Sequence, residues 1–414
     1  MGKENEEQVK AEAAKLFDVA GFEEEIRKAR DDTRPSHEEE MQHLAKLELW
    51  TTILGAVGCV CMVRGVLSPI SMIALGYYRY AKFAILAHHS LHGGWGIHRR
   101  GWFAQGIYRR MVDWLDWIFP DAWVIEHNKV HHYRLNEDAD PDYVQRNTEL
   151  VRKFPTWPVR YAMVGVNAAI WKWAYYASNT LKILHAHKPG APAPEVLDQP
   201  LTLNDLMLQM LTCRSCSTLQ WYLRFTADFI FRVMGPPLVW NFVFIPMCAY
   251  VIGQLTTGSG WHFFTMAVVN FLGAELVNNV HAFCTIVTNH AGVDLWHFDE
   301  PCRADCGEFY LRATLGSAAY HAGTDLIDYF HGFLNYQCEH HAFPALSPLH
   351  YQRLHPRFKA VCAKYGVPYV QEPFWVRTKK TADIITGAAV HKEMQGQASH
   401  HPEMWIIDPK IAGN

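Results

Sequence analysis

At residues 337–341 the chain reads Gln337-Cys338-Glu339-His340-His341, which places one carboxamide and two imidazoles within little more than one helical turn. An α-helix advances about 100° per residue, so positions i, i+3 and i+4 share one face. Gln337, His340 and His341 have this spacing, and we expect their side chains to point the same way. Because imidazole is the commonest metal ligand in proteins, the segment predicts one part of a metal site.

Two further histidine clusters lie upstream of this segment. Each contains a pair of histidines four residues apart, which puts both imidazoles on one face of a helix. The pairs are His88 and His92 in the first cluster, and His127 and His131, followed by His132, in the second. One such pair is common by chance, but three clusters indicate a shared site. Ligands rich in nitrogen suit iron, copper or zinc rather than magnesium or calcium.

Four apolar stretches are interleaved with the clusters, at about 47–64, 68–87, 236–253 and 261–283. Each is close to the ~20 residues that a helix needs to cross a bilayer. The short link between the first two stretches predicts an antiparallel helical hairpin. We therefore predict an all-α integral membrane protein with about four transmembrane helices.

The order of stretches and clusters predicts a topology. The first two clusters lie between the second and third stretches, and the last cluster follows the fourth, so an even number of crossings separates them. Two short loops join the first stretch to the second and the third to the fourth, and Arg64 is the one Lys or Arg in them. The side with the clusters carries most of the Lys and Arg, which favours the cytosol for that side. The histidines should then lie in a cytosolic helical cap that holds two metal ions. Residues 157–180 should form an interfacial helix, because a further crossing would separate the clusters.

Three domains are expected. Residues 1–46 should form a charged cytosolic N-terminal helix, 47–375 the membrane domain, and 376–414 a cytosolic tail. The leader has no apolar run of signal-peptide type, so we expect a multi-pass protein of the endoplasmic reticulum membrane. The net charge of -3, without a basic stripe, excludes nucleic acid as a partner.

The three boxes, H-x-x-x-H, H-x-x-x-H-H and Q-x-x-H-H, resemble those of the membrane fatty-acid desaturase superfamily. Residues 334–344 are similar to the third box of its front-end, acyl-lipid branch, and the resemblance covers about residues 47–370. It implies two iron ions bound to the boxes on the cytosolic side of four spans. It also implies a further ligand before the last box, for which His290 is the candidate and His281 the weaker alternative. The expected ligands are His88, His92, His127, His131, His132, His290, His340 and His341.

Other side chains are expected beside the metal ions, either as ligands or as their hydrogen-bond partners. Gln337, Asn289 and His89 belong to this group. A metal-bound histidine usually donates its other N–H to a carboxylate or a carbonyl, and an acidic turn, Asp138 to Asp142, follows the second box. Asp138, Asp140 and Asp142 are equal candidates for this role. The segment is equally well interpreted as a polar turn that does not contact the metal site.

The resemblance implies an O2-dependent fatty acyl desaturase that forms a cis double bond with two electrons at its di-iron site. The substrate would be a fatty acyl lipid or an acyl-CoA, surrounded by membrane lipids. Front-end enzymes commonly carry a fused cytochrome b5 domain with a His-Pro-Gly-Gly motif. Only His92-Gly93-Gly94 approaches that motif here, so we expect a separate electron donor, either cytochrome b5 with its reductase or ferredoxin.

Other functions stay open at this point. A hydroxylase, an acetylenase or a conjugase uses the same boxes. A zinc-dependent membrane hydrolase would use metal-bound hydroxide to attack a carbonyl. A metal transporter fits less well, because its ligands should lie near the middle of the bilayer, whereas these boxes lie outside the apolar stretches. The sequence predicts no substrate-binding residues.

Overall fold

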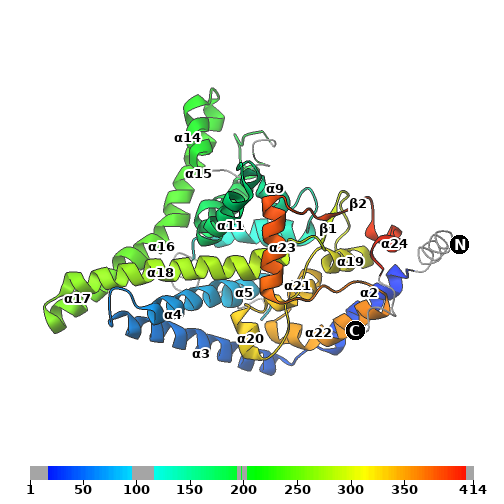
Figure 1. Ribbon diagram of the computed structural model, residues 1–414, viewed down its shortest axis with the longest axis horizontal. Coiled ribbons are helices and arrows are strands. Elements are labelled where there is room, and N and C mark those ends of the chain that lie inside the picture. The colour runs from blue at the N-terminus through cyan, green and yellow to red at the C-terminus, as the bar shows by residue number, and fades with distance from the viewer. Residues whose placement is uncertain (1–16, 96–115, 194–196, 198–202, 407–414) are drawn as a thin grey trace. The chain divides into compact units, whose positions relative to one another are not determined.

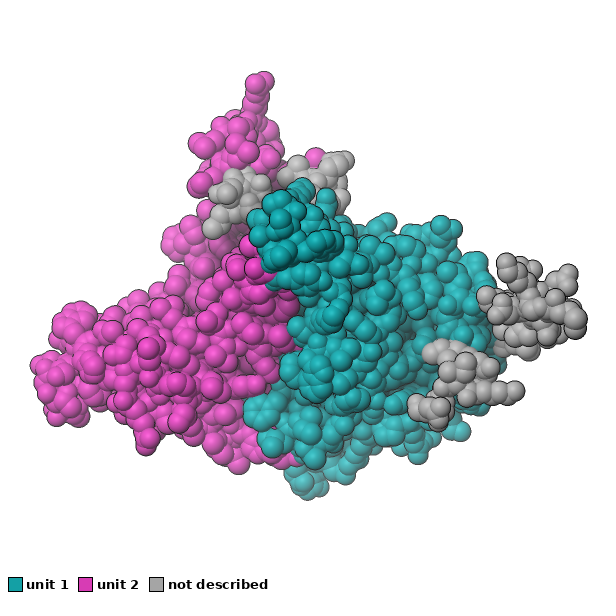
Figure 2. Space-filling view, viewed as in Figure 1, with its two compact units in different colours: residues 1–42, 130–161, 285–414 teal, residues 43–129, 162–284 magenta. Residues whose placement is uncertain are grey.

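The computed structural model describes residues 17–95, 116–193, 197 and 203–406. The chain folds into two compact units, which Figure 2 shows in different colours. Unit 1 comprises residues 1–42, 130–161 and 285–414, and unit 2 comprises 43–129 and 162–284. Both are mainly helical, which confirms the predicted all-α class.

The predicted helical hairpin is present in unit 2. Helix α3 (His37–Met62) is followed by a short link and by α4 (Pro69–Tyr80), where Ser68 caps the first turn. Close packing joins the two helices: the Ser71 hydroxyl donates to the Gly58 carbonyl over 2.7 Å. A side chain at Gly58 would collide with Leu75, so this glycine allows the helices to approach each other.

Helix α4 continues without a break toward the first histidine box. A π-helical segment, Ala81–Ala87, leads into α5 (His88–His92), so the predicted stretch 68–87 is helical throughout. Charged groups are buried along this stretch. Arg79 forms a buried ion pair with Glu275 of α18, and Lys172 lies over the Phe83 ring at 4.1 Å from the centroid.

Among the described residues, three helical runs are long and apolar enough to cross a membrane: His37–Met62, Cys216–Thr257 and Gly260–Asn289. The chain is thus associated with a membrane, and the predicted count of four is approximate. The second run begins about twenty residues before the predicted start at 236, because it joins several shorter helices. These are α15 (Cys216–Asp228), α16 (Gly235–Val239) and α17 (Ile245–Thr257), with π-helical turns between them.

The bend in this run has a local cause. Figure 1 shows that its direction changes between α15 and α17. Pro236 and Pro237 lie in the intervening α16, and proline removes a backbone donor and pushes against the preceding turn. The third run is mainly α18 (Gly260–Ile286), and Asn270 in it donates to the carbonyls of Gly65 and Val66 in the hairpin link.

The remaining helices of unit 2 flank these runs. They are α8 (Pro120–Ile125), α11 (Trp157–Trp171), α12 (Ala177–Ala186) and α14 (Leu203–Thr212). Helix α11 begins in unit 1 and ends in unit 2. The run that contains α11 and α12 is not among the three membrane-crossing candidates, and the interfacial helix at 157–180 stays a prediction. The apolar core of unit 2 includes Leu75, Phe271, Trp221 and Phe225.

Unit 1 surrounds the third histidine box. Its longer helices are α2 (Val19–Asp32), α19 (Gly307–Leu315), α22 (Pro348–Lys364) and α23 (Phe374–Thr386). Its shorter helices are α9 (Val144–Asn147), α10 (Glu149–Arg152), α20 (Asp325–Phe330), α21 (Gln337–Ala342) and α24 (Pro402–Trp405). Strands β1 (Trp296–Phe298) and β2 (Lys392–Met394) pair in parallel, with Trp296 opposite Lys392.

The core of unit 1 explains why its N-terminal helix is ordered. Phe22 and Ile26 of α2 pack with Tyr310 of α19 and with Leu354 and Phe358 of α22, all fully buried. Helix α2 and the first residues of α3 lie in the leader, whose expected cytosolic location stays a prediction. The predicted domain boundaries after residues 46 and 375 stay predictions.

Candidate metal centre

The third box forms a short helix whose polar side chains are buried. Helix α21 spans Gln337–Ala342, and the relative exposures of Gln337, His340 and His341 are 2%, 0% and 1%. The Gln337 side-chain nitrogen lies 3.0 Å from Nε2 of His341. The predicted i, i+4 face is therefore present at this box.

Three imidazoles from separate segments of unit 1 converge at this face. Nε2 of His290 lies 3.3 Å from Nε2 of His131 and 3.0 Å from Nε2 of His341. The exposures of His131, His290 and His341 are 1%, 6% and 1%, and their ligand atoms are close enough to share a metal ion. The structure thus brings His290 to the third box, as the resemblance implies.

The spacing of these nitrogens fits a bound transition metal. Two imidazole nitrogens, each ~2.1 Å from one ion, are ~3.0 Å apart at a right angle and ~3.4 Å apart at the tetrahedral angle. The observed separations of 3.0 and 3.3 Å lie in this interval. The Gln337 side-chain nitrogen is 3.1 Å from His290 Nε2. Because amide nitrogen and oxygen are assigned from such contacts, rotation of the amide would present its oxygen to the same point.

Hydrogen bonds at the opposite ring nitrogens orient the imidazoles. Nδ1 of His131 lies 2.8 Å from Asp140 Oδ1, and Nδ1 of His290 lies 2.8 Å from the Ile286 carbonyl oxygen. A carbonyl oxygen only accepts, so Nδ1 of His290 carries the proton and its Nε2 keeps a free lone pair. The carboxylate of Asp140 favours the same tautomer at His131.

Tyr351 orients the imidazole of His340 by a hydrogen bond at Nδ1. Nδ1 of His340 lies 3.0 Å from the Tyr351 hydroxyl, which in turn donates to the Phe343 carbonyl over 2.8 Å. Burial raises the pKa of Tyr351 well above its usual value, so the phenol stays neutral. Because its one proton goes to Phe343, the hydroxyl accepts from His340 Nδ1–H, so the lone pair of the neutral imidazole is on Nε2.

The electrostatics keep His290 neutral. Burial, together with the neighbouring His131, lowers the pKa of His290 to about 3. Burial also opposes a charge on His131, but the nearby Asp140 carboxylate outweighs this and raises the pKa of His131. A buried, neutral imidazole next to an imidazole that is bound to a carboxylate offers electron pairs to a cation. Binding of a cation would stabilise this arrangement.

His132 and His340 extend this group of imidazoles. The His132 ring centroid lies 4.6 Å from that of His341 and 4.7 Å from that of His340. Both residues are almost fully buried. Unit 1 therefore gathers the predicted ligands His131, His132, His290, His340 and His341.

The other predicted ligands form a second group, in unit 2. The ring centroids of His88, His92 and His127 lie 4.9 to 5.3 Å from one another. Trp123 stacks on His127 at 4.4 Å and closes one side of the group. His89 is fully buried next to them, with its ring 4.9 Å from that of His88.

The second box differs from the predicted helix. The chain is π-helical at Glu126–Val130 and turns into a 3-10 helix at His131–Tyr133. His127 and His131 therefore do not follow the regular i, i+4 geometry of an α-helix. The change of helix type falls between them in the chain, and they are assigned to different units.

The structure distinguishes the three aspartates of the acidic turn. Asp140 is fully buried and holds His131, while its Oδ2 accepts from the Asn136 backbone N–H over 2.8 Å. Asp138 is exposed and pairs with His297 at 3.1 Å. The backbone N–H of Asp142 donates to Asp140. Among the three, Asp140 has the geometry of a ligand's partner.

Asn289 and the weaker candidates also have defined places. The Asn289 amide donates to the Leu334 carbonyl over 2.8 Å and lies 3.4 Å from the Gln337 side-chain oxygen, so it contacts the group without facing its centre. His281 lies in unit 2 beside Tyr77 and Tyr80. Nδ1 of His331, in unit 1, lies 2.8 Å from the Ile327 carbonyl oxygen.

Arg377 supports the His290 loop, and sequence reasoning missed it. Its guanidinium is fully buried and donates to the Thr288 carbonyl over 3.4 Å and the Ala291 carbonyl over 2.9 Å, on the two sides of His290. It also binds both oxygens of Asp294 at 2.7 Å. A side chain at Gly292 would collide with this guanidinium. No spacing in the sequence links Arg377 to the boxes.

An Asp140→Asn variant tests the orientation of His131. The amide keeps the size of the carboxylate but removes its charge, so we expect metal affinity to fall about 10- to 100-fold while the fold is retained. Competition with a chelator would measure this. Asp138→Asn, at an exposed side chain of the same turn, is the matched control and should leave affinity unchanged. Equal effects of the two substitutions would contradict the assigned role of Asp140.

The sequence of this chain is similar to the sequences of several known proteins. Fatty acid desaturase 3 of Bos taurus is 32% identical over 186 residues, which cover 39% of this chain and 40% of the relative. Delta(5) fatty acid desaturase A of Dictyostelium discoideum is 31% identical over 137 residues, 30% of each chain. The NADPH-dependent stearoyl-CoA 9-desaturase of Mycobacterium tuberculosis is 34% identical over 98 residues, 23% of each chain.

These matches are partial. The chain spans about two fifths or less of the length of the curated relatives it matches, and no solved structure matches it. A model of the family described as fatty acid desaturase, however, matches residues 65–373, which is most of the chain and includes all three boxes. The chain therefore belongs to the fatty acid desaturase family.

Proposed function

We propose that this chain is an O2-dependent fatty acyl desaturase that introduces a cis double bond into an acyl chain with two electrons at a di-iron centre. One observation carries the proposal: Nε2 atoms of His131, His290 and His341 converge in a buried site, in a member of the fatty acid desaturase family. The hydrogen bonds at Nδ1 of His131 and His290 support it, because they favour the tautomer in which Nε2 carries the lone pair that a metal ion needs.

The proposed ligands of the two iron ions are the eight histidines that the boxes and the His290 segment contain. They are His88, His92, His127, His131, His132, His290, His340 and His341. Gln337, Asn289, His89 and Asp140 are proposed as weak ligands or as partners of ligands. Iron suits nitrogen donors, and when bound it would supply the oxidant for removing hydrogen from an unactivated methylene, which no side chain can do.

The residues of the chain have positioning roles in this proposal. Asp140, the Ile286 carbonyl and Tyr351 hold the Nδ1 protons of three imidazoles. Burial of the group excludes bulk water, which strengthens the electrostatic interactions inside it. The apolar helices of unit 2 offer an environment in which an acyl chain is soluble.

The substrate, donor and compartment are also proposals. A fatty acyl lipid or an acyl-CoA fits the family, and the name of one matched relative specifies stearoyl-CoA. We propose that the electrons come from a separate protein, cytochrome b5 with its reductase or ferredoxin. The endoplasmic reticulum membrane, with the metal site facing the cytosol, is the proposed location, because the side of the boxes is rich in Lys and Arg.

Expression in yeast tests the function. Cells fed a range of fatty acids should accumulate a new unsaturated acyl chain, and His340→Ala should abolish it. His321→Ala, at an exposed histidine, is the control and should leave the product unchanged. An oxygenated, acetylenic or conjugated product would instead indicate a hydroxylase, an acetylenase or a conjugase. Zinc in the purified protein, with turnover that does not need O2, would refute the proposal in favour of a hydrolase.

A further inference from the structure

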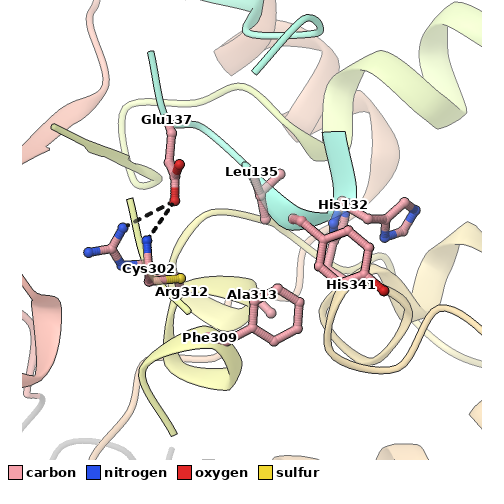
Figure 3. Close-up of a pocket in the computed structure, with 9 residues that line it drawn as sticks. His132, Leu135, Glu137, Cys302, Phe309, Arg312, Ala313 and His341 are labelled. Atoms are coloured by element: carbon pink, nitrogen blue, oxygen red, sulfur yellow. Dashed lines mark hydrogen bonds and ion pairs between the residues drawn. The ribbon is translucent and has the colours of Figure 1, made fainter. Parts of the chain in front are cut away.

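A small pocket in unit 1 adjoins the predicted metal ligands. Figure 3 shows the imidazoles of His132 and His341 on one side of it and Glu137, Cys302 and Arg312 on the other. Leu135, Phe309 and Ala313 form its apolar surfaces. Tyr133 also lines the pocket, and this side chain is 37% exposed. The pocket therefore extends from the protein surface to two of the imidazoles.

The polar wall of the pocket is held in place by hydrogen bonds. Oε1 of Glu137 accepts from the Cys302 backbone N–H at 3.2 Å and from Arg312 at 3.4 Å, and Oε2 accepts from Arg134 at 3.2 Å. Arg312 in turn binds Glu308 at 2.6 Å. Glu137 and Arg312 are only 4% and 3% exposed. Because these charges are paired and buried, the wall cannot turn inward to fill the space without breaking ion pairs.

The size and lining of the pocket identify what it accommodates. Its cavity volume is about 10 Å³, which is room for about one water molecule at a time, and part of the space around it is open to solvent. An acyl chain would be too large and would meet a buried ion pair. Most of the lining surface is apolar, but Glu137, Arg312 and the two imidazoles bring hydrogen-bonding groups to it, and a cavity with several such groups holds water. Small polar species therefore fit this pocket best.

We propose that this pocket is the passage through which water and protons move between the surface of unit 1 and the metal site. The inference rests on the proposed desaturation, because that reaction takes up protons and releases water at the metal site. One O2, two electrons from the donor protein and two protons convert CH2–CH2 into CH=CH and two water molecules. Two C–H bonds and the O–O bond break, and four O–H bonds form. Protons must therefore enter, and water must leave, in every turnover.

A bulky substitution in the lining of the pocket tests the proposed passage. Cys302→Phe places a ring at a partly exposed position in the lining, whereas Cys302→Ser is nearly isosteric and serves as the matched control. The probe is azide, a small anion that binds ferric iron and is followed by its visible absorption in stopped-flow mixing with the iron-loaded, full-length protein. We expect about tenfold slower azide association in Cys302→Phe, because a filled passage must open locally first. Cys302→Ser should match the unmodified protein.

A second variant and the iron content separate the outcomes. Ala313→Val narrows the pocket from its apolar side and should also slow azide, which keeps the test informative if Cys302→Phe does not fold. Azide association at the unmodified rate in iron-loaded Cys302→Phe or Ala313→Val would overturn the passage and leave the proposed function standing. Failure of the unmodified protein to bind iron would overturn the proposed function itself.

Discussion

A His341→Ala variant should lose both bound iron and any unsaturated product. Nε2 of His341 lies 3.0 Å from Nε2 of His290 and 3.0 Å from the Gln337 amide, and its ring packs against His132. Removal of the imidazole takes one of three converging donors from a buried group. The loss of affinity should exceed the ~10- to 100-fold that is typical when only a partner of a ligand is removed.

Iron content per chain and the acyl profile of expressing cells would measure this effect. His331→Ala is the matched control, because His331 lies in the same unit but bonds the Ile327 carbonyl and not the converging group. It should retain both iron and product. If His341→Ala kept its iron, the convergence of Nε2 atoms would not be a metal site.

An Arg377→Met variant should be strongly destabilised. The guanidinium is fully buried. It forms ion pairs with Asp294 and Glu372 and donates hydrogen bonds to the carbonyls of Thr288 and Ala291. Methionine fills much of the same volume but leaves the carbonyls of Thr288 and Ala291 without this donor, while Asp294 and Glu372 keep Lys380 as a partner. The expected cost is about 2–5 kcal/mol in the free energy of unfolding, because each buried carbonyl left unsatisfied costs roughly 1–3 kcal/mol. Metal binding should also weaken, because the loop that carries His290 loses two anchors.

Thermal unfolding of the purified protein in detergent, with and without iron, would report this change. Lys380→Met is the control: Lys380 pairs with the same Asp294 and Glu372 but is partly exposed, so its loss should cost about 1 kcal/mol or less. Arg377→Lys keeps the charge and should recover part of the stability. Equal melting temperatures for Arg377→Met and Lys380→Met would show that the His290 loop does not depend on Arg377.

The spacing of polar and apolar residues predicted much of this architecture. Local periodicity decides the hairpin of α3 and α4, the helical form of the third box and the grouping of imidazoles within the first and third boxes. His290 came from the family resemblance, and its approach to His341 agrees with it. These features depend on residues that are close in sequence or on a motif that covers most of the chain.

Other features depend on contacts between distant segments, and no local pattern reports them. Asp140 was one of three equivalent aspartates until the folded turn pointed its carboxylate at His131. Arg377 is separated from His290 by 87 positions and by the third box, so its role appears only after α23 is packed. The Cys216 start of the second membrane-crossing run was missed because several short helices join there without an apolar signal.

The π-helical segment Ala81–Ala87, directly before His88 and His92, has a consequence for how this chain tolerates changes in length. A π-helical turn contains about one residue more than an α-helical turn. Loss of one residue here would let the backbone relax into a regular α-helix, a conformation that is easier to form. Because the π-helical turn absorbs the extra residue, this deletion would leave the later side chains close to their present phase. Loss of one residue from the regular turns of α4 would instead rotate every later side chain by about 100°, which would point both imidazoles of the first box away from His127.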